Sequence, residues 1–536
     1  MENAQRKKIA GAAVIVMSAL VISRITGFLR STLVPNMIAE AWKMEAFNLS
    51  FRITDFMFNL LVGGAIAAAL IPVLSGYLAK DEEEDGWKAV GTFINITFIS
   101  MVAVSVLGII FAPQIVGAMA PRFDERTRAL AVTLTRILFP SVAFLMLAGM
   151  TNGVLNSYQR FAAAAYGPSL YNIGSALSIL LLSRFGVETA VFGIACSAAV
   201  YFFFQLSFAL KNLKYYRFKI YLGHQGFKRL FKLAVPSLVS SSVMQVNVLI
   251  SSFFTVLFSG GINAYTMAND VWQMPFGIFA VGMGAAILPS LSEKLALGQV
   301  EDYKEILLKG IKSVIFFTVP SAIAFVVLGK PIIAAIYKWT ARFDLSLIDN
   351  TGNILMVFSI AVIAHSMLAI INRAFYANND TKTPLYVGIG AVLQTVVLNY
   401  IFTRVTSLGP AGMALSYSIT GIVNLSILTY ILNRRMKGIG LKRLLIFVSK
   451  VFFAAAIMGM VLYFGDMLVP VDIYAPFSSS LKMRELAWLL GEVVAGVAVY
   501  FGVVMLMGLE EARYMLRLIQ GKAERVFPAI KKFLSR

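Results

Sequence analysis

Of the four arginines that stand in otherwise apolar stretches of the chain, three are candidates for binding an anion, and the fourth, Arg136, is close to a span end. Arg24 and Arg30 belong to SRITGFLRS, residues 23–31, and Arg52 lies in the next apolar segment. An arginine at the centre of a bilayer costs roughly 2.5–3.5 kcal/mol on insertion scales, so such residues usually face a protein interior or a water-filled cavity. A guanidinium group binds phosphate oxygens in a bidentate manner. The pattern therefore predicts a site for a phosphate or diphosphate group, with Ser23 beside Arg24 as part of it.

Arg30 has an alternative interpretation, because it lies nearer the end of its apolar run and could reach the membrane surface instead. Two carboxylates accompany the arginines. Asp55 follows Arg52 by three residues, which places both on one helix face, either as an ion pair or as part of the binding site. Asp270 has no basic neighbour in sequence. It is either a site for a coupling ion or the end of a loop.

Several kinds of chemistry are disfavoured by what the sequence lacks. Cys196 is the only cysteine, and His224 and His365 are the only histidines, whereas zinc normally takes three or four such ligands. There is no GxxxxGK[ST] phosphate loop for hydrolysing ATP. We therefore expect a transporter rather than an enzyme, with neither a metal site nor a cofactor. The basic residues are dispersed over the loops, so we expect no nucleic-acid partner.

The elements that carry these residues are long apolar helices. The chain has 536 residues, of which 59% are hydrophobic and 14% charged, which is typical of a polytopic membrane protein. A membrane-spanning helix needs about 20 mainly apolar residues. Fourteen such spans are predicted, near residues 9–33, 45–75, 89–112, 129–153, 161–183, 188–210, 229–258, 267–291, 308–328, 352–372, 384–404, 410–432, 444–465 and 485–508. The second and eighth are the least regular, because they are rich in Gly and Ala and run into prolines.

Orientation follows from the lysines and arginines, which favour the cytoplasmic side of a membrane. They concentrate in residues 211–232, in residues 433–450 and after Gly508, so both termini are expected in the cytoplasm. The net charge of +20 also favours contact with anionic membrane lipid. Residues 509–536 form either an amphipathic helix on the membrane surface or a frayed basic tail.

Similar stretches recur about 220 residues apart, which indicates an internal duplication. The pairs are AAALIPVLS at 67–75 with GAAILPSLS at 284–292, RFD at 122–124 with 342–344, the stretches that begin at Asn152 and Asn372, and FGIACSAAV near Gly193 with AGMALSYSI near Gly412. Each copy holds six spans, so the second copy has the orientation of the first, as in a parallel repeat.

The predicted fold is therefore all-α, with two six-helix lobes around a central cavity and two additional helices. We expect an N-terminal lobe at 1–222, a C-terminal lobe at 223–438, an additional helix pair at 439–508 and a cytoplasmic tail at 509–536.

The stretches SRITGFLR, IPVLSGYL, ILPSLSEK and NRAFYANNDTKTP, taken from residues 23–30, 71–78, 287–294 and 372–384, resemble the MurJ (MviN) family of lipid II flippases. That family belongs to the same superfamily as the MATE exporters and the polysaccharide flippases. The resemblance implies a protein of the bacterial cytoplasmic membrane. It implies movement of the undecaprenyl-diphosphate-linked peptidoglycan precursor, lipid II, from the inner to the outer leaflet. The expected mechanism is alternating access without ATP, driven by membrane potential or by a gradient of Na+ or H+.

The resemblance also suggests roles for single residues. Arg24 and Arg30 match arginines that are thought to bind the diphosphate, and Glu45 matches an acidic position before the second span. The last two spans match a helix pair that forms a groove for the lipid tail. Four further site candidates are positions of the repeated motif: Asn152 in the first copy, and Asn372, Arg373 and Asp380 in the second. The sequence departs from the family at two positions where arginines are frequent, which here are Phe58 and Asp270.

Other functions remain open at this point. A flippase for another polyprenyl-linked glycan and a MATE-like exporter are both compatible with most of these features, although the thirteenth and fourteenth spans disfavour the exporter. A membrane scaffold that binds cell-wall synthesis proteins without transporting anything is a further alternative, but it leaves Arg24 unexplained.

Overall fold

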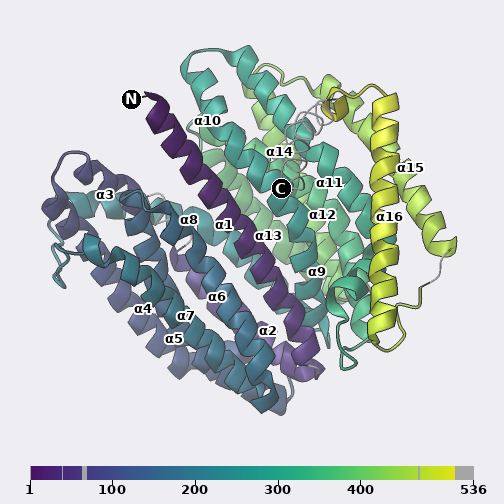
Figure 1. Cartoon of the computed structure of the whole chain (residues 1–536), viewed down its shortest axis with the longest axis horizontal. Coiled ribbons are helices and arrows are strands. Elements are labelled where there is room, and N and C mark those ends of the chain that lie inside the picture. The colour runs from purple at the N-terminus through teal and green to yellow at the C-terminus, as the bar shows by residue number, and fades with distance from the viewer. Residues whose placement is uncertain (1, 39, 63–68, 469–470, 514–536) are drawn as a thin grey trace, which may run out of the picture. The chain divides into compact units, whose positions relative to one another are not determined.

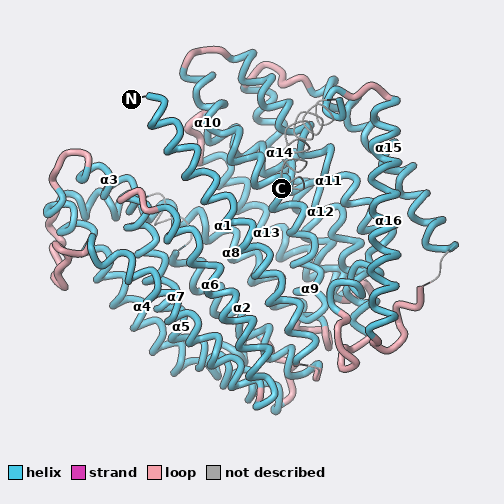
Figure 2. The backbone as a smooth tube through the Cα atoms, viewed as in Figure 1, coloured by secondary structure: helices cyan, strands magenta, loops and turns pink. Residues whose placement is uncertain are grey.

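The computed structural model describes residues 2–38, 40–62, 69–468 and 471–513, and every element in these ranges is helical (Figure 2). The helices of the first half are α1 (Glu2–Met37), α2 (Ala41–Val62), α3 (Ile71–Leu78), α4 (Glu83–Met119), α5 (Glu125–Ser157), α6 (Phe161–Leu182), η2 (Ser183–Phe185), α7 (Val187–Ala209) and η3 (Leu210–Asn212). Those that follow are α8 (Gln225–Thr255), α9 (Gly261–Pro275), η4 (Phe276–Val281), α10 (Gly282–Ala296), α11 (Val300–Tyr337), α12 (Ser346–Ala377), α13 (Lys382–Val405), α14 (Pro410–Arg435), α15 (Leu441–Leu468) and α16 (Ser479–Leu506).

Ten helical segments in the described part of the chain are long and apolar enough to cross a membrane. The predicted class, an all-α polytopic membrane protein, is therefore confirmed. Each of the fourteen predicted spans falls on a described helix or on consecutive helices, so that count is consistent with the structure. The helices are longer than the apolar runs. For example, α4 begins at Glu83 and spans 37 residues, or about 55 Å at 1.5 Å per residue, which exceeds the thickness of a bilayer.

The two irregular spans each comprise more than one described element. The second consists of α2 and α3, with residues 63–68 between them outside the described part of the chain. The eighth consists of α9, the π-helical turn η4 and α10, and Pro275 stands at the junction of α9 with η4. Proline removes a backbone donor, and glycine is a poor helix former, so a break in the regular helix at such positions has a direct cause.

The turns repeat along the chain as the helices do. Left-handed backbone conformations occur at Asp81 and Gly298, at Gln159 and Asn379, and at Gly186 and Gly409, which lie 217, 220 and 223 residues apart. A left-handed residue costs energy except at glycine or, to a smaller degree, asparagine and aspartate. Its recurrence between corresponding helices shows that the duplication seen in the sequence extends to the backbone of the turns.

The chain forms two compact units. The first contains residues 1–267, 342–344 and 395–413, and within it α1 packs along α6 while α2 packs on α5 and α8 (Figure 1). Its core lies among α3, α4, α5 and the start of α8, around Trp87, Met150 and Leu230. This unit carries Arg24, Arg30 and Arg52.

The second unit contains residues 268–341, 345–394 and 414–536. Its core is built by α11 and α12, on which α10 and α15 pack, and α16 packs on α11 and α15. The additional helix pair, α15 and α16, is therefore attached to this unit through α11. The predicted amphipathic tail falls largely on residues 514–536, outside the described part of the chain.

Candidate functional site

The arginine-bearing helix α1 is fixed by a polar contact with α6. Asn172 Nδ2 donates to the carbonyl oxygen of Ser23 at 3.2 Å and lies 3.5 Å from Ser23 Oγ. One turn later, Gly27 permits the close approach, because a Cβ there would lie 3.2 Å from Asn172 Nδ2. Ser23 thus contributes to the packing of α1 against α6. Six residues turn through roughly 600° on an ideal helix, so Arg24 and Arg30 lie about 120° apart around α1.

Arg24 and Arg30 differ in their surroundings. Arg24 is exposed and Arg30 is half-buried. The guanidinium carbon of Arg30 lies 5.9 Å from the ring centroids of both Phe51, on α2, and Tyr171, on α6, which is within reach for a cation–π interaction.

Arg52 and Asp55 lie three residues apart on α2. Arg52 is half-buried and donates from Nη2 to Thr266 Oγ1 of α9 at 3.4 Å. Asp55 is exposed, and Tyr171 lies within electrostatic reach of both Asp55 and Arg30. Arg30, Asp55 and Tyr171 therefore form one group, while Arg52 turns to α9. We call Arg24, Arg30, Arg52, Asp55 and Tyr171 the arginine face.

Glu45 serves a different purpose, at the start of α2. It is half-buried, and its Oε1 accepts a hydrogen bond from the backbone N–H of Gly260, the left-handed residue just before α9. Next to it, Asn48 Nδ2 donates to Asn263 Oδ1 at 2.8 Å, and both asparagines are buried. Together with the Arg52–Thr266 bond, these contacts form a ladder that joins the start of α2 to the start of α9.

Asp270 belongs to the second unit and is half-buried on α9. It lies within electrostatic reach of Tyr337, which is fully buried at the end of α11. Asp270 thus stands beside a buried phenol.

The repeated motif residues mostly support turns and helix packing. Asn152 Nδ2 donates to the Ala164 carbonyl of α6 at 2.9 Å, and its Oδ1 accepts from Asn156 at 2.6 Å. In the second copy, Asn372 Oδ1 is buried without a hydrogen-bond partner among the described residues. Arg373 is half-buried, with its guanidinium carbon 5.9 Å from the Tyr376 ring.

Asp380 holds the turn between α12 and α13. Its carboxylate accepts from the backbone N–H of Thr383 at 2.9 Å and from the Thr383 hydroxyl at 2.6 Å, and it forms an ion pair with Arg435 at the end of α14. Burial alone would raise the pKa of Asp380, but the bonds from Thr383 and the charge of Arg435 lower it to about 2. Asp380 is therefore ionised at neutral pH and ties the turn to α14.

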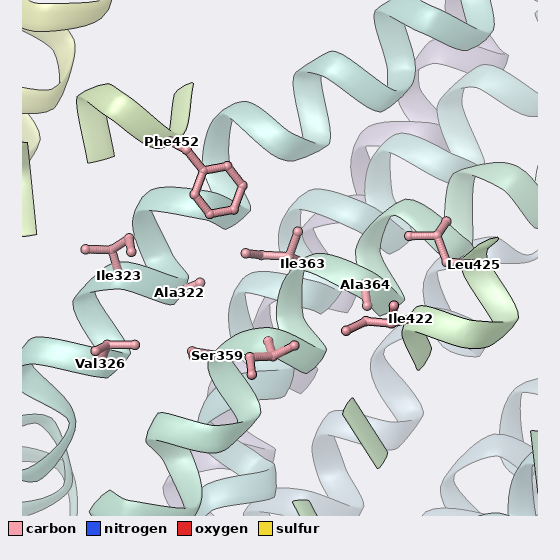
Figure 3. Close-up of a pocket in the computed structure, with 10 residues that line it drawn as sticks. Ala322, Ile323, Val326, Ser359, Ile363, Ala364, Ile422, Leu425 and Phe452 are labelled. Carbon is pink, nitrogen blue, oxygen red and sulfur yellow. The ribbon is translucent and has the colours of Figure 1, made fainter. Parts of the chain in front are cut away.

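An apolar groove lies in the second unit, where α11, α12 and α14 meet Phe452 of α15 (Figure 3). Its volume is about 360 Å³. The side chains that line it are Ala322, Ile323, Val326, Ser359, Ile360, Ile363, Ala364, Ile422, Leu425 and Phe452. A groove of this composition suits a hydrocarbon chain and offers nothing to a charged group.

Sequence reasoning did not select Tyr171, Asn172, Thr266 or Arg435, although each contacts a residue that it did select. Each partner is far away in sequence, and only the fold brings it close. Tyr171 and Asn172 are adjacent polar residues in an otherwise apolar span, which is the one signal in the sequence that would have drawn attention to them.

The sequence is similar to proteins of one family. A family model described as lipid II flippase MurJ matches residues 36–484. The lipid II flippase MurJ of Burkholderia cenocepacia is 28% identical over 430 residues, which cover 78% of this chain and 82% of that protein. The probable lipid II flippase MurJ of Vibrio cholerae is 26% identical over 516 residues, covering 94% and 97%.

The fold is also similar to solved structures. A lipid II flippase MurJ in an inward closed conformation aligns with a TM-score of 0.77 at 23% identity, covering 92% of this chain and 98% of that one. A multidrug resistance transporter of the MATE family in an inward-facing conformation aligns with a TM-score of 0.67 at 16% identity, covering 79% and 98%. At these identities the similarity concerns the fold.

Proposed function

The chain belongs to the lipid II flippase MurJ family, and on this basis we propose that it carries lipid II from the inner to the outer leaflet of the bacterial cytoplasmic membrane by alternating access. The observation that carries the proposal is the match of the family model over residues 36–484. The substrate is an undecaprenyl-diphosphate-linked peptidoglycan precursor. In this proposal the protein is a transporter and both of its termini lie in the cytoplasm.

The arginine face is the proposed site for the diphosphate. Arg24 is exposed, and the arginine face carries three guanidinium groups but only the carboxylate of Asp55. A diphosphate would supply the missing negative charge, and a guanidinium can bind two of its oxygens at once. The rings of Phe51 and Tyr171 hold the Arg30 side chain in place, which lowers the entropic cost of ordering it on binding.

The apolar groove is the proposed site for part of the lipid tail. It lies where α15 meets the α11–α12–α14 side of the second unit, and its lining is almost wholly hydrocarbon. The helix pair α15–α16 would then guide the tail while the head group occupies the arginine face. This division suits a substrate with a charged head and a long apolar tail.

The ladder between α2 and α9 is the proposed contact that must open during transport. It consists of polar side chains, and such contacts exchange readily for water when helices separate. Neither ATP nor a resident cofactor is invoked. We propose that membrane potential or a Na+ or H+ gradient drives the cycle, with Asp270 as the candidate residue for ion coupling.

A leaflet-accessibility assay for lipid II tests the function directly. Bacteria depleted of their own flippase should accumulate lipid II that is shielded from an external probe, and resupply of this protein should restore labelling. If labelling stays low while the protein is present in the membrane at normal levels, the proposal is wrong.

Arg24→Ala tests the assigned site. We expect normal membrane levels but no growth of the depleted bacterium, because the exposed cation of the arginine face is lost. Arg136→Ala is the matched control, since Arg136 is also an exposed arginine on an apolar helix, and its Nε donates only to the Ile109 carbonyl. Growth with Arg24→Ala equal to that with the control would remove Arg24 from the site.

A further inference from the structure

The start of α8 carries three cations that no described carboxylate neutralises. Lys228, Arg229 and Lys232 are all exposed, and none of them forms an ion pair among the residues that the structure describes. Lys228 and Lys232 are four residues apart, so they lie on one face of the helix, where like charges destabilise it slightly. An anion bound between the two lysines would relieve this repulsion.

These cations stand near the start of a span that the sequence predicts at residues 229–258. Residues 233–269, which follow Lys232, contain no charged side chain. Lys232 is therefore the last charge before the chain enters the apolar part of the bilayer. Basic residues at such a boundary lie at the level of the lipid head groups.

A groove runs along the same face of α8. It has a volume of about 430 Å³ and is lined by Phe227, Lys228, Phe231, Lys232 and Val235. The two phenylalanine rings lie 6.2 Å apart. Phe227 is buried in the core, whereas Phe231 is 56% exposed. The groove thus combines ammonium groups with an apolar wall that continues into the charge-free stretch.

The loop before α8 is held rigidly in place. Asn95, a buried residue of α4, donates from Nδ2 to the carbonyl oxygens of Arg217 and Lys219 at 3.1 and 2.9 Å, and its Oδ1 accepts from the Tyr216 hydroxyl at 2.6 Å. The Tyr216 side chain is used in these bonds, whereas three apolar side chains of the loop are exposed. Those of Phe218, Ile220 and Leu222 are 63%, 45% and 61% exposed.

Apolar side chains that alternate with exposed basic residues, such as Arg217 and Lys219, suit the boundary between head groups and acyl chains. The loop therefore presents an apolar surface next to the cations of α8, at the depth where the head group of a phospholipid meets its acyl chains.

We propose that the α8 groove binds one anionic glycerophospholipid. Its phosphate lies between Lys228 and Lys232, and one acyl chain follows Phe231 and Val235. The charge of the groove favours an anionic lipid over a zwitterionic one, and the exposed apolar wall favours a lipid over a free phosphate. This site is separate from the arginine face and does not require the substrate to be lipid II.

Native mass spectrometry of the full chain, released from nanodiscs of phosphatidylglycerol and phosphatidylcholine, tests the proposal. The wild type should retain a phosphatidylglycerol molecule that the double variant Lys228→Gln/Lys232→Gln loses. Each basic residue near a charged membrane surface contributes about fivefold in affinity, so a loss of roughly 30-fold is expected. The matched control is Lys437→Gln/Lys442→Gln, which removes two exposed lysines that form no ion pair among the described residues.

Two further arms separate the possible outcomes. Phe231→Ala keeps the charges and should also lose the lipid, because the acyl chain loses its wall. Inorganic phosphate at millimolar concentration should not displace the lipid. Equal loss in the control variant would show general attraction between charges and overturn the proposal. Retention by Phe231→Ala, or displacement by phosphate, would identify a phosphate site and also overturn it. Flipping of lipid II is measured in a separate assay, so the outcome of the lipid-binding experiment does not decide the test of transport.

Discussion

Lys338 Nζ lies 2.5 Å from Glu485 Oε1, and the two side chains are only 1% and 3% exposed. Lys482, 3% exposed, approaches the other carboxylate oxygen at 3.5 Å. Backbone carbonyl groups stabilise the remaining positive charge. Lys338 Nζ donates to the carbonyl oxygens of Ile473 and Ala475 at 2.7 and 3.1 Å. Lys482 Nζ donates to the carbonyl oxygen of Ala334 at 2.7 Å. The cluster therefore fastens the loop between α15 and α16, and the first turns of α16, to the end of α11.

Replacing Glu485 by glutamine should destabilise the protein strongly. Removing one partner of a buried pair leaves charge uncompensated and typically costs about 3–5 kcal/mol. Thermal unfolding in detergent measures the effect. The control is Glu305→Gln, which breaks the exposed Lys309–Glu305 pair, an interaction worth roughly 0–1 kcal/mol. Equal melting temperatures for the two variants would contradict the role of the cluster.

Arg24→Lys should restore flipping only in part. Lysine keeps the charge but loses the planar fork that binds two phosphate oxygens. Growth rate and lipid II exposure in flippase-depleted cells, compared at equal protein levels, give the measurement. If lysine supports wild-type rates, then Arg24 acts as a simple positive charge.

The Asn48–Asn263 hydrogen bond should appear as a coupling between two mutations. Either alanine variant alone leaves a buried amide without its partner, at a cost of about 1–3 kcal/mol. When one asparagine is already replaced, replacing the other should lower the free energy of unfolding by less than it does in the wild type. The difference is the coupling energy, expected at about 0.5–3 kcal/mol. Melting temperatures of the two single variants and the double variant provide the cycle. Strict additivity would mean that the two asparagines do not interact.

Asp380 should give a stability difference that depends on pH. Its pKa in the folded protein is about 2, below the value of about 3.9 in an unfolded chain. A depressed pKa contributes stability above the unfolded value, and this contribution is lost as the pH falls through the folded value. The difference in melting temperature between wild type and Asp380→Asn should therefore be full at pH 6 and shrink between about pH 4 and pH 2. A difference that stays constant over this range would show that the carboxylate charge is not what stabilises the turn.

Asp270→Asn should change how transport depends on sodium or on pH. The carboxylate is the one described acidic side chain on α9, so its neutralisation removes the candidate site for a coupling ion. Flipping rates at a series of sodium concentrations and pH values provide the readout. The same dependence in wild type and variant would exclude Asp270 from ion coupling.

Most of the fold was predictable because the apolar runs are long and the loops are short. The helix ends were less predictable. Helix α4 starts with Glu83, Glu84 and Asp85, residues that a hydropathy pattern assigns to a loop, although acidic side chains favour the first turn of a helix through its dipole. The duplication was visible in sequence and reappears in the turns.

Only the charged residues of the candidate site could be predicted from the sequence. Arg30 could be selected because an arginine in an apolar run is unusual, but its position between Phe51 and Tyr171 depends on the packing of α1 against α2 and α6. In the same way, the bond from Arg52 to Thr266 spans 214 residues. Such pairs arise from tertiary packing, and a periodic pattern within one helix carries no information about them.

The left-handed turns at Gln159 and Asn379 are each followed by a charged residue, and the two charges are opposite. Arg160 Nη1 donates to the Phe208 carbonyl near the end of α7 at 3.1 Å, whereas Asp380 pairs with Arg435 at the end of α14. Swapping these two turns would set a guanidinium against Arg435 and a carboxylate against a carbonyl oxygen, and both contacts would repel. The two halves share one pattern, but their turns cannot be exchanged alone. A chimera that exchanges these turns would also have to exchange the ends of α7 and α14.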